Sequence, residues 1–254
     1  MQHAVIRIRT EEPDYSGLEN KDYDWKYSCY GGAEEELPTD APPAKGKRVV
    51  TSHFIDANLF HDLISGKAVT GTLHFLNKTP VDWFTKLQST VETATFGSEC
   101  VAARTCTEQI IDLRLSLRYL GVNINGPAYM FGDNQSVVNT ASAPHGKLHK
   151  RHTALSFHRT RFAIAAGVLR FHHVAGKRNP ADILSKHWDF PSAWPMLKPI
   201  LFWPRDTGEL LEDDGKPMRE PTIDPAVEDH ALLKDAKVVG IDNNVKAPSG
   251  DSGT

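Results

Sequence analysis

The sequence predicts a mixed α/β domain in which three strands come first and helices then alternate with strands. Residues 49–56, 69–77 and 81–87 are rich in the β-branched and aromatic residues that favour strands. Apolar residues then recur at three- and four-residue multiples over residues 101–120, which is helical spacing. A further strand candidate, residues 168–174, comes after more helices, and this order is typical of one sheet covered by helices.

The first three strands are expected to form an antiparallel meander. The first of them ends in Asp56, and in the second Thr70, Thr72 and His74 alternate with apolar or small residues. Only Lys78-Thr79-Pro80 separates the second strand from the third, and so short a connection indicates a hairpin.

A long helix follows the meander. It is expected to carry Glu99 in its first turn and to stop at Gly121. Its apolar series consists of Val101, Ile110, Leu113, Leu117 and Leu120.

A fourth strand ends abruptly in Gly132 and Asp133, so the Asp133 side chain should project from the end of that strand. A short helix is expected at residues 136–140, with a break near Pro144, and a longer one at residues 153–166.

The fifth strand, residues 168–174, leads into a loop at residues 175–179. A last helix is expected to open with Asn179 as its cap and Pro180 at its first position. Asp182 then lies near the start of that helix.

The chain of 254 residues is expected to hold one domain with flanking extensions. Residues 1–48 are rich in acidic residues, glycine and proline and are interpreted as a linker. Residues 49–188 form the domain, and residues 189–254 are interpreted as a C-terminal extension that is largely irregular or disordered.

Composition narrows the function classes. Three cysteines are too few for a disulfide framework, which fits a reducing, intracellular compartment, and no segment has the length and apolarity of a membrane span. The net charge of -3 does not mark the whole chain as a nucleic-acid binder.

Four acidic residues are expected to converge at one edge of the sheet, because each lies at a strand end or a helix start. Four carboxylates brought together repel, and Mg²⁺ is the natural cation to compensate them because it prefers oxygen ligands. The alternative is that these residues cap helices or lie on the surface. The four are Asp56, Glu99, Asp133 and Asp182.

As an ordered set, the motifs around these acids resemble the ribonuclease H domain of copia-type retrotransposon polyproteins. The resemblance covers residues 47–188 and, more loosely, the acidic residues 25–38, which look like the connection that trails a reverse transcriptase. Its motifs are Ile55-Asp56-Ala57, Gly97-Ser98-Glu99-Cys100-Val101-Ala102, Gly132-Asp133-Asn134-Gln135-Ser136, Arg151-His152, Phe157-His158 and Ala181-Asp182-Ile183-Leu184-Ser185-Lys186.

The resemblance implies a ribonuclease H-like fold, a five-stranded mixed sheet with three antiparallel strands, then two parallel ones, and flanking helices. It implies an enzyme that cleaves the RNA strand of RNA:DNA hybrids endonucleolytically with two Mg²⁺ or Mn²⁺ ions. It also implies a partner, the reverse transcriptase region of the same polyprotein, and it leaves a cytoplasmic, particle-associated location and a nuclear one open. The implied catalytic and metal-binding residues are Asp56, Glu99, Asp133 and Asp182.

The sequence departs from the family pattern in two places that bear on catalysis. Leu59-Phe60-His61-Asp62 stands where the family has a glycine and an acid after its first aspartate. Cellular relatives carry a proton-shuttling histidine in the loop before the last acid, and Gly176-Lys177-Arg178-Asn179 has none. Protonation of the leaving group, or release of the product, would then depend on water, on Lys177 or on a histidine from another part of the chain.

Basic residues concentrate between His145 and His187, where Asp182 is the sole acid, and this excess predicts a track for phosphate backbones. A solvated helix face is the alternative, and a zinc site at His145, His149 and His152 is a weaker one because no cysteine accompanies them. A hybrid would be recognised by its shape and its 2′-hydroxyl groups. The residues expected to bind nucleic acid are Asn134, Gln135, Lys147, Lys150, Arg151, His152, His158, Lys177 and Arg178.

Two other functions stay open from the sequence. One is a catalytically inactive domain that binds hybrid or packs against a polymerase, which the altered Leu59–Asp62 stretch favours. The other is a resolvase or transposase on the same fold, which would cut DNA.

Overall fold

The structure is a computed structural model that describes residues 5, 6, 8–19, 23–148 and 151–202. Its centre is a five-stranded mixed sheet of β2 (Thr51–Asp62), β3 (Lys67–Leu76), β4 (Thr79–Leu87), β5 (Ala128–Gly132) and β6 (Leu169–His173). The strand order is β4-β3-β2-β5-β6. β2, β3 and β4 pair antiparallel, and β5 and β6 join them as parallel strands. The predicted ribonuclease H-like fold class is confirmed.

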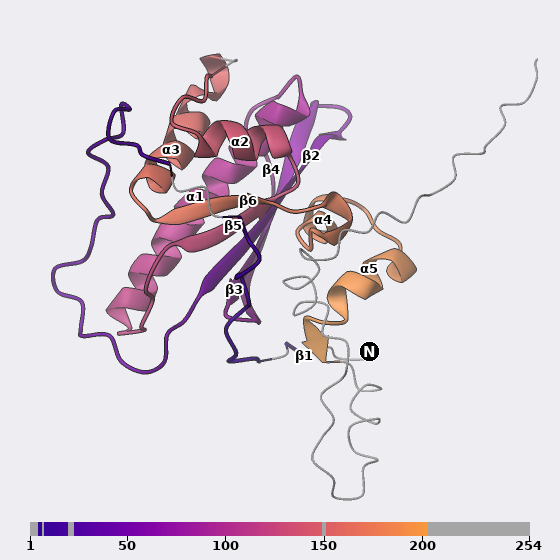
Figure 1. Ribbon diagram of the computed structural model, residues 1–254. Coiled ribbons are helices and arrows are strands. Elements are labelled where there is room, and N and C mark those ends of the chain that lie inside the picture. Colours follow the sequence, from indigo (N-terminus) through magenta and orange to yellow (C-terminus); the bar gives the residue numbers. More distant parts are fainter. Residues whose placement is uncertain (1–4, 7, 20–22, 149–150, 203–254) are drawn as a thin grey trace, which may run out of the picture.

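Three helices cover one face of the sheet (Figure 1): α1 (Thr95–Tyr119), α2 (Gln135–Ser142) and α3 (Ala154–Ala165), the last preceded by a 3₁₀ turn at Arg151–Thr153. The core under them is mainly apolar, with a few buried polar side chains such as His53, His74 and Thr107. Its buried residues include Ile55, Ile110, Met130, Val137, Ala163 and Phe171.

The other face carries a second, smaller core and a short helix, α4 (Asp182–Ser185), which follows a 3₁₀ turn at Gly176–Arg178. Phe54, Phe131 and Ala181 are buried in this core. Each face of the sheet therefore carries an apolar core, and the two faces are covered by different parts of the chain.

Residues 189–202, expected to be largely irregular, form α5 (Phe190–Leu197) and the strand β7 (Leu201–Phe202). β7 pairs with β1 (Val5–Ile6) in a separate two-stranded sheet. Residues 203–254 lie outside the described residues. Of the helices in the described part, none is long and apolar enough to cross a membrane.

Two helix starts differ from the prediction. α1 begins at Thr95, so Glu99 lies beyond its first turn. That turn was not predicted because Phe96 is a single apolar residue among Thr95, Gly97 and Ser98. α4 begins only at Asp182 with Ala181 as its cap. Asn179, the predicted cap, is fully buried, accepts from the Ala181 amide and donates to the Ile55 carbonyl, so it ties the loop to β2.

The described part of residues 1–48, predicted as a linker, packs on the domain. Residues 23–48 run as an extended arc outside the helices (Figure 1). Tyr15 lies on the second face of the sheet, 4.3 Å from Tyr129 between ring centroids, and its hydroxyl is hydrogen-bonded to Ser52. Burial of this hydroxyl raises the pKa of Tyr15.

Two buried arginines hold the arc to the helices. Arg161 of α3 donates to the carbonyl oxygens of Thr140, Ala143 and Pro144, and its guanidinium lies 4.9 Å from the Trp25 ring centroid. Arg161 is only 2% exposed, so it does not belong to a surface track for phosphates.

Glu35 makes the second link. Its carboxylate accepts two hydrogen bonds from Arg114, at 2.7 and 3.0 Å, and two from Arg118, at 2.7 and 2.8 Å. Partial burial alone would raise the pKa of Glu35, but these donors outweigh it and hold that pKa below its ordinary value.

We expect Glu35→Gln to lower the free energy of unfolding by about 1–3 kcal/mol at pH 7, because Arg114 stays buried without its carboxylate. Since the pKa of Glu35 is lowered in the fold, its contribution is present above the ordinary pKa of 4.5 and is lost as the pH falls through the folded-state pKa. Urea unfolding of both proteins at pH 7 and pH 3.5 measures this. The matched control is Glu36→Gln, at an exposed neighbour, which should change stability little; equal losses in the two variants would contradict the assignment.

Candidate metal centre

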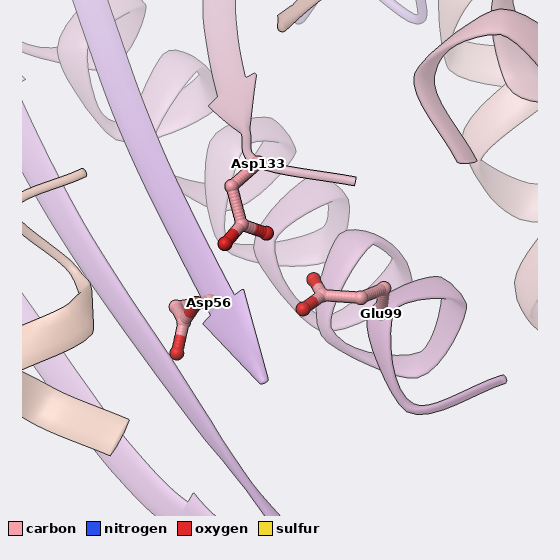
Figure 2. Close-up of side chains that lie close together, drawn as sticks. All are labelled: Asp56, Glu99 and Asp133. Carbon is pink, nitrogen blue, oxygen red and sulfur yellow. The ribbon is translucent and has the colours of Figure 1, made fainter. Parts of the chain in front are cut away.

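Three carboxylates meet at one edge of the sheet. One oxygen each from Asp56 on β2, Glu99 on α1 and Asp133 after β5 lie within 4.8 Å of one another. Figure 2 shows the side chains of Glu99 and Asp133 directed toward a common space beside β2. β2 and β5 are parallel neighbours, so residues at the same end of both strands reach the same edge.

The sequence predicted that Asp56 ends its strand, and this is wrong because β2 continues to Asp62. Pairing with β3 sets Asp56 opposite Gly71, and the register shifts between Asn58 and Asp62. A Cβ at position 71 would lie 2.9 Å from the Ala181 carbonyl oxygen and 3.0 Å from the Leu184 Cβ. Glycine there lets α4 approach the sheet beside Asp56.

Burial and mutual repulsion oppose ionisation of this group. Burial raises the pKa of Asp56 to about 6 although Ser185 and Lys186 counteract it, and neighbouring Asp182 and Asp133 add to the rise. Burial, followed by the charges of Asp56 and Asp133, raises the pKa of Glu99 well above its ordinary value, while a hydrogen bond from the Ala57 amide, 3.2 Å long, works the other way.

A divalent cation would compensate the repulsion among these carboxylates. Three carboxylates with oxygen atoms close together are a donor set that Mg²⁺ and Mn²⁺ prefer, and a bound cation would reverse the effects that raise the pKa values of Asp56 and Glu99. Glu99, Asp56 and Asp133 are the residues that could hold it.

Asp182, the fourth predicted ligand, is not part of this group of three. Its carboxylate is buried and forms an ion pair with the ammonium group of Lys186, four residues later. The same ammonium nitrogen lies 3.5 Å from Oδ2 of Asp56, and the Ser185 hydroxyl also donates to that oxygen. The Lys186 ammonium group therefore lies between the carboxylates of Asp182 and Asp56.

An open cavity of about 650 Å³ lies over the carboxylates. Two predicted nucleic-acid-binding residues, Asn134 and Gln135, line it together with Lys186. Asn134 also caps α2, since its Oδ1 accepts from the amides of Ser136 and Val137. Asp56, Glu99 and Asp133 all line this cavity.

The other predicted nucleic-acid-binding residues have mixed surroundings. Lys147, Arg151 and Lys177 are exposed, Arg178 is partly buried, and Lys150 lies outside the described residues.

Two predicted histidines have protein partners. His152 Nε2 lies 2.8 Å from Oε2 of the buried Glu92, and His158 Nδ1 is hydrogen-bonded to the Tyr30 hydroxyl. Both residues are nevertheless exposed. His149, the third residue of the zinc alternative, lies outside the described residues, so that alternative stays untested.

The sequence interpretation assigned no role to Ser185 or His173, and it counted Lys186 only among the basic residues between His145 and His187. His173 ends β6, and its Nε2 donates to the Asp133 carbonyl oxygen over 3.0 Å. The four-residue spacing from Asp182 to Lys186 is a readable signal for an ion pair on a helix. Contact between His173 and Asp133 follows only from the pairing of Gly132 with His173 across β5 and β6.

The sequence of the chain is similar to parts of known retrotransposon polyproteins. The chain is 25% identical over 158 residues to the retrovirus-related Pol polyprotein from transposon TNT 1-94 of Nicotiana tabacum. It is 24% identical over 142 residues to that from transposon RE2 of Arabidopsis thaliana. The relatives of the chain are retrotransposon Pol polyproteins. This confirms the resemblance expected from the motifs.

The matches cover 62% and 56% of the chain but only 11% and 10% of these polyproteins, so the chain spans a small part of their length. No protein-family model matches the chain.

Solved structures were compared as well. The N-terminal RNase H domain of a Mycobacterium tuberculosis protein is 15% identical, with a TM-score of 0.41, and the match covers 59% of this chain and 97% of that one. RNase H1 from Halobacterium salinarum is 14% identical, with a TM-score of 0.40, over 59% of this chain and 98% of that one. The fold assignment rests on the strand order of the chain itself.

We expect Glu99→Gln to stabilise the metal-free protein at pH 8, because the amide carries no charge to be buried beside Asp56 and Asp133. The folded-state pKa of Glu99 is raised, so its stabilising contribution is complete below the ordinary pKa of 4.5 and is lost as the pH rises through the folded-state pKa. The difference between variant and wild type should therefore close at pH 4. Urea unfolding with a chelator at both pH values measures it.

Glu108→Gln is the matched control on the same helix, because Glu108 is partly exposed and pairs only with Arg104 in the described part of the chain. It should lack the pH-dependent gain. Added Mg²⁺ at pH 8 should raise the melting temperature of the wild type and leave Glu99→Gln nearly unchanged. A Glu99→Gln protein that is less stable than wild type at pH 8 without metal would contradict the electrostatic account.

Proposed function

We propose that this domain hydrolyses the RNA strand of RNA:DNA hybrids with Mg²⁺ or Mn²⁺. The observation that carries the proposal is the convergence of Asp56, Glu99 and Asp133 within 4.8 Å at one edge of a ribonuclease H-like sheet. The relationship to retrotransposon Pol polyproteins supports a nuclease of this type.

We assign the residues of the site to cation binding, to contact with RNA and to positioning of the backbone. Asp56, Glu99 and Asp133 would hold the cation, which when bound polarises a phosphate oxygen and lowers the pKa of a bound water. Glu99 comes from the helix side of the cavity, where it can also accept a hydrogen bond from an RNA hydroxyl. His173 holds the Asp133 backbone, so the third carboxylate stays at the strand end.

The substrate is proposed from the surroundings of the cavity. Asn134 and Gln135 border it, and Lys147, Arg151 and Lys177 are exposed basic residues that can contact phosphates. The hybrid would be recognised by shape and by 2′-hydroxyl groups. The reverse transcriptase region of the same polyprotein is the proposed partner that makes such hybrids.

A second candidate function is a catalytically inactive domain that binds hybrid. It is favoured by the register shift of β2 between Asn58 and Asp62 and by the positive φ of Phe60, 54°, in the stretch that departs from the family pattern. This candidate predicts hybrid binding without cleavage in either metal.

We expect Asp133→Asn to reduce Mg²⁺-dependent cleavage of a labelled hybrid by at least about 100-fold, because an amide cannot replace a carboxylate ligand in charge. The fold should persist, since the two side chains have nearly the same shape. Cleavage assays on hybrid, duplex RNA and duplex DNA, with and without Mg²⁺, together with thermal unfolding, measure both effects.

Asp112→Asn, at an exposed position of α1, is the matched control and should cleave as wild type does. Undiminished cleavage by Asp133→Asn would remove the basis of the proposal. Hybrid binding by wild type without cleavage would favour the inactive domain, and cutting of duplex DNA in place of hybrid would favour a resolvase-like enzyme.

A further inference from the structure

Lys186 lies beside two of the four acids, Asp56 and Asp182. It directly follows the last residue of α4, and its ammonium forms an ion pair with Asp182 and lies 3.5 Å from Oδ2 of Asp56. The side chain is 37% exposed and lines the same cavity as the three converging acids. One basic group thus bridges two of the four acids that the family resemblance assigns to metal.

The local chain geometry favours this bridge. Residues four apart on a helix lie on the same side, so Asp182 and Lys186 meet through the short α4 helix itself. The close approach of α4 to Gly71 then brings the pair to Asp56, which lies opposite Gly71 in the sheet. Ser185 donates to the same Asp56 oxygen as Lys186, so two donors from one helix end occupy that oxygen.

A divalent cation and an ammonium group cannot occupy this place together. A cation shared by Asp56 and Asp182 needs carboxylate oxygens at about 2.1 Å, and these oxygens already bind Lys186. Positive charges a few ångströms apart in a buried site also repel strongly. A second ion would therefore have to expel Lys186 from both acids.

We infer that Lys186 is a positioning residue that takes the place of a second divalent ion between Asp56 and Asp182, so that the chain binds one ion, at Asp56, Glu99 and Asp133. The inference rests on the proposed function for the identity of the site. It replaces the two ions that the resemblance implies by one ion and one ammonium group. The ammonium compensates Asp56 and Asp182 and keeps α4 at the sheet, but it does not polarise water as a metal ion does.

The test counts bound Mn²⁺ in the full chain by electron paramagnetic resonance, without substrate. We expect one ion in the wild type and two in Lys186→Gln, because the variant frees the oxygens of Asp56 and Asp182. Asp182→Asn should leave the count at one, and the double variant should return it from two to one. Lys86→Gln, at an exposed position of β4, is the control for loss of a lysine and should bind one.

Two results would overturn the inference. Two ions in the wild type that fall to one in Asp182→Asn would make Asp182 a ligand and Lys186 a displaced group. One ion in both wild type and Lys186→Gln would show that Lys186 does not exclude a second ion. If Lys186→Gln does not fold, the comparison of wild type with Asp182→Asn decides alone: equal counts of one support the inference, and a fall from two to one overturns it.

The failure of the proposed function looks different. If the wild type binds one ion and cleaves no hybrid, the inference about Lys186 stands and the proposed reaction is wrong. A folded wild type that binds no ion loses both. With active protein, the cleavage rate should rise with the first power of free Mg²⁺ at low concentration, and a second-power dependence would count against a single ion.

Discussion

The constraint on which the rest of this structure depends is the proximity of three carboxylates, two of which belong to buried residues. Asp56, Glu99 and Asp133 come from a strand, a helix and a strand end, and each is held by backbone that the core fixes. Their proximity costs free energy in the absence of a cation. The apolar layers on both faces of the sheet supply the rigidity that keeps three repelling groups in contact.

Much of the fold was predictable because it depends on local pattern. The five strands and the long helices follow from alternation and from helical spacing, and Asp133 was placed correctly because a glycine ends the apolar run of β5. The first turn of α1 was missed because Phe96 is its one apolar residue and Thr95, Gly97 and Ser98 give no helical spacing around it. The end of β2 was missed because an aspartate inside a strand resembles a strand end.

The rest depends on contacts between distant residues. Glu35 meets Arg114 across 79 positions, and no local pattern in an acidic, proline-containing segment announces such a partner. Arg161 counted as one of many basic residues in the sequence, yet three carbonyl oxygens and an aromatic ring enclose it. Among the four acids, the sequence could show their order but not that Asp182 lies beside a lysine that also reaches Asp56.

The close contact at Gly71 has a further meaning for how such a site changes over time. The separation between α4 and the sheet is set there by a hydrogen atom in place of a side chain, so the position of the fourth acid depends on a residue that takes no part in chemistry. Any larger side chain would move α4 outward, with Asp182, Ser185 and Lys186 on it. A related chain with a larger residue at this position of β3 would thus lose the arrangement on one side of Asp56, with all four acids still present in its sequence.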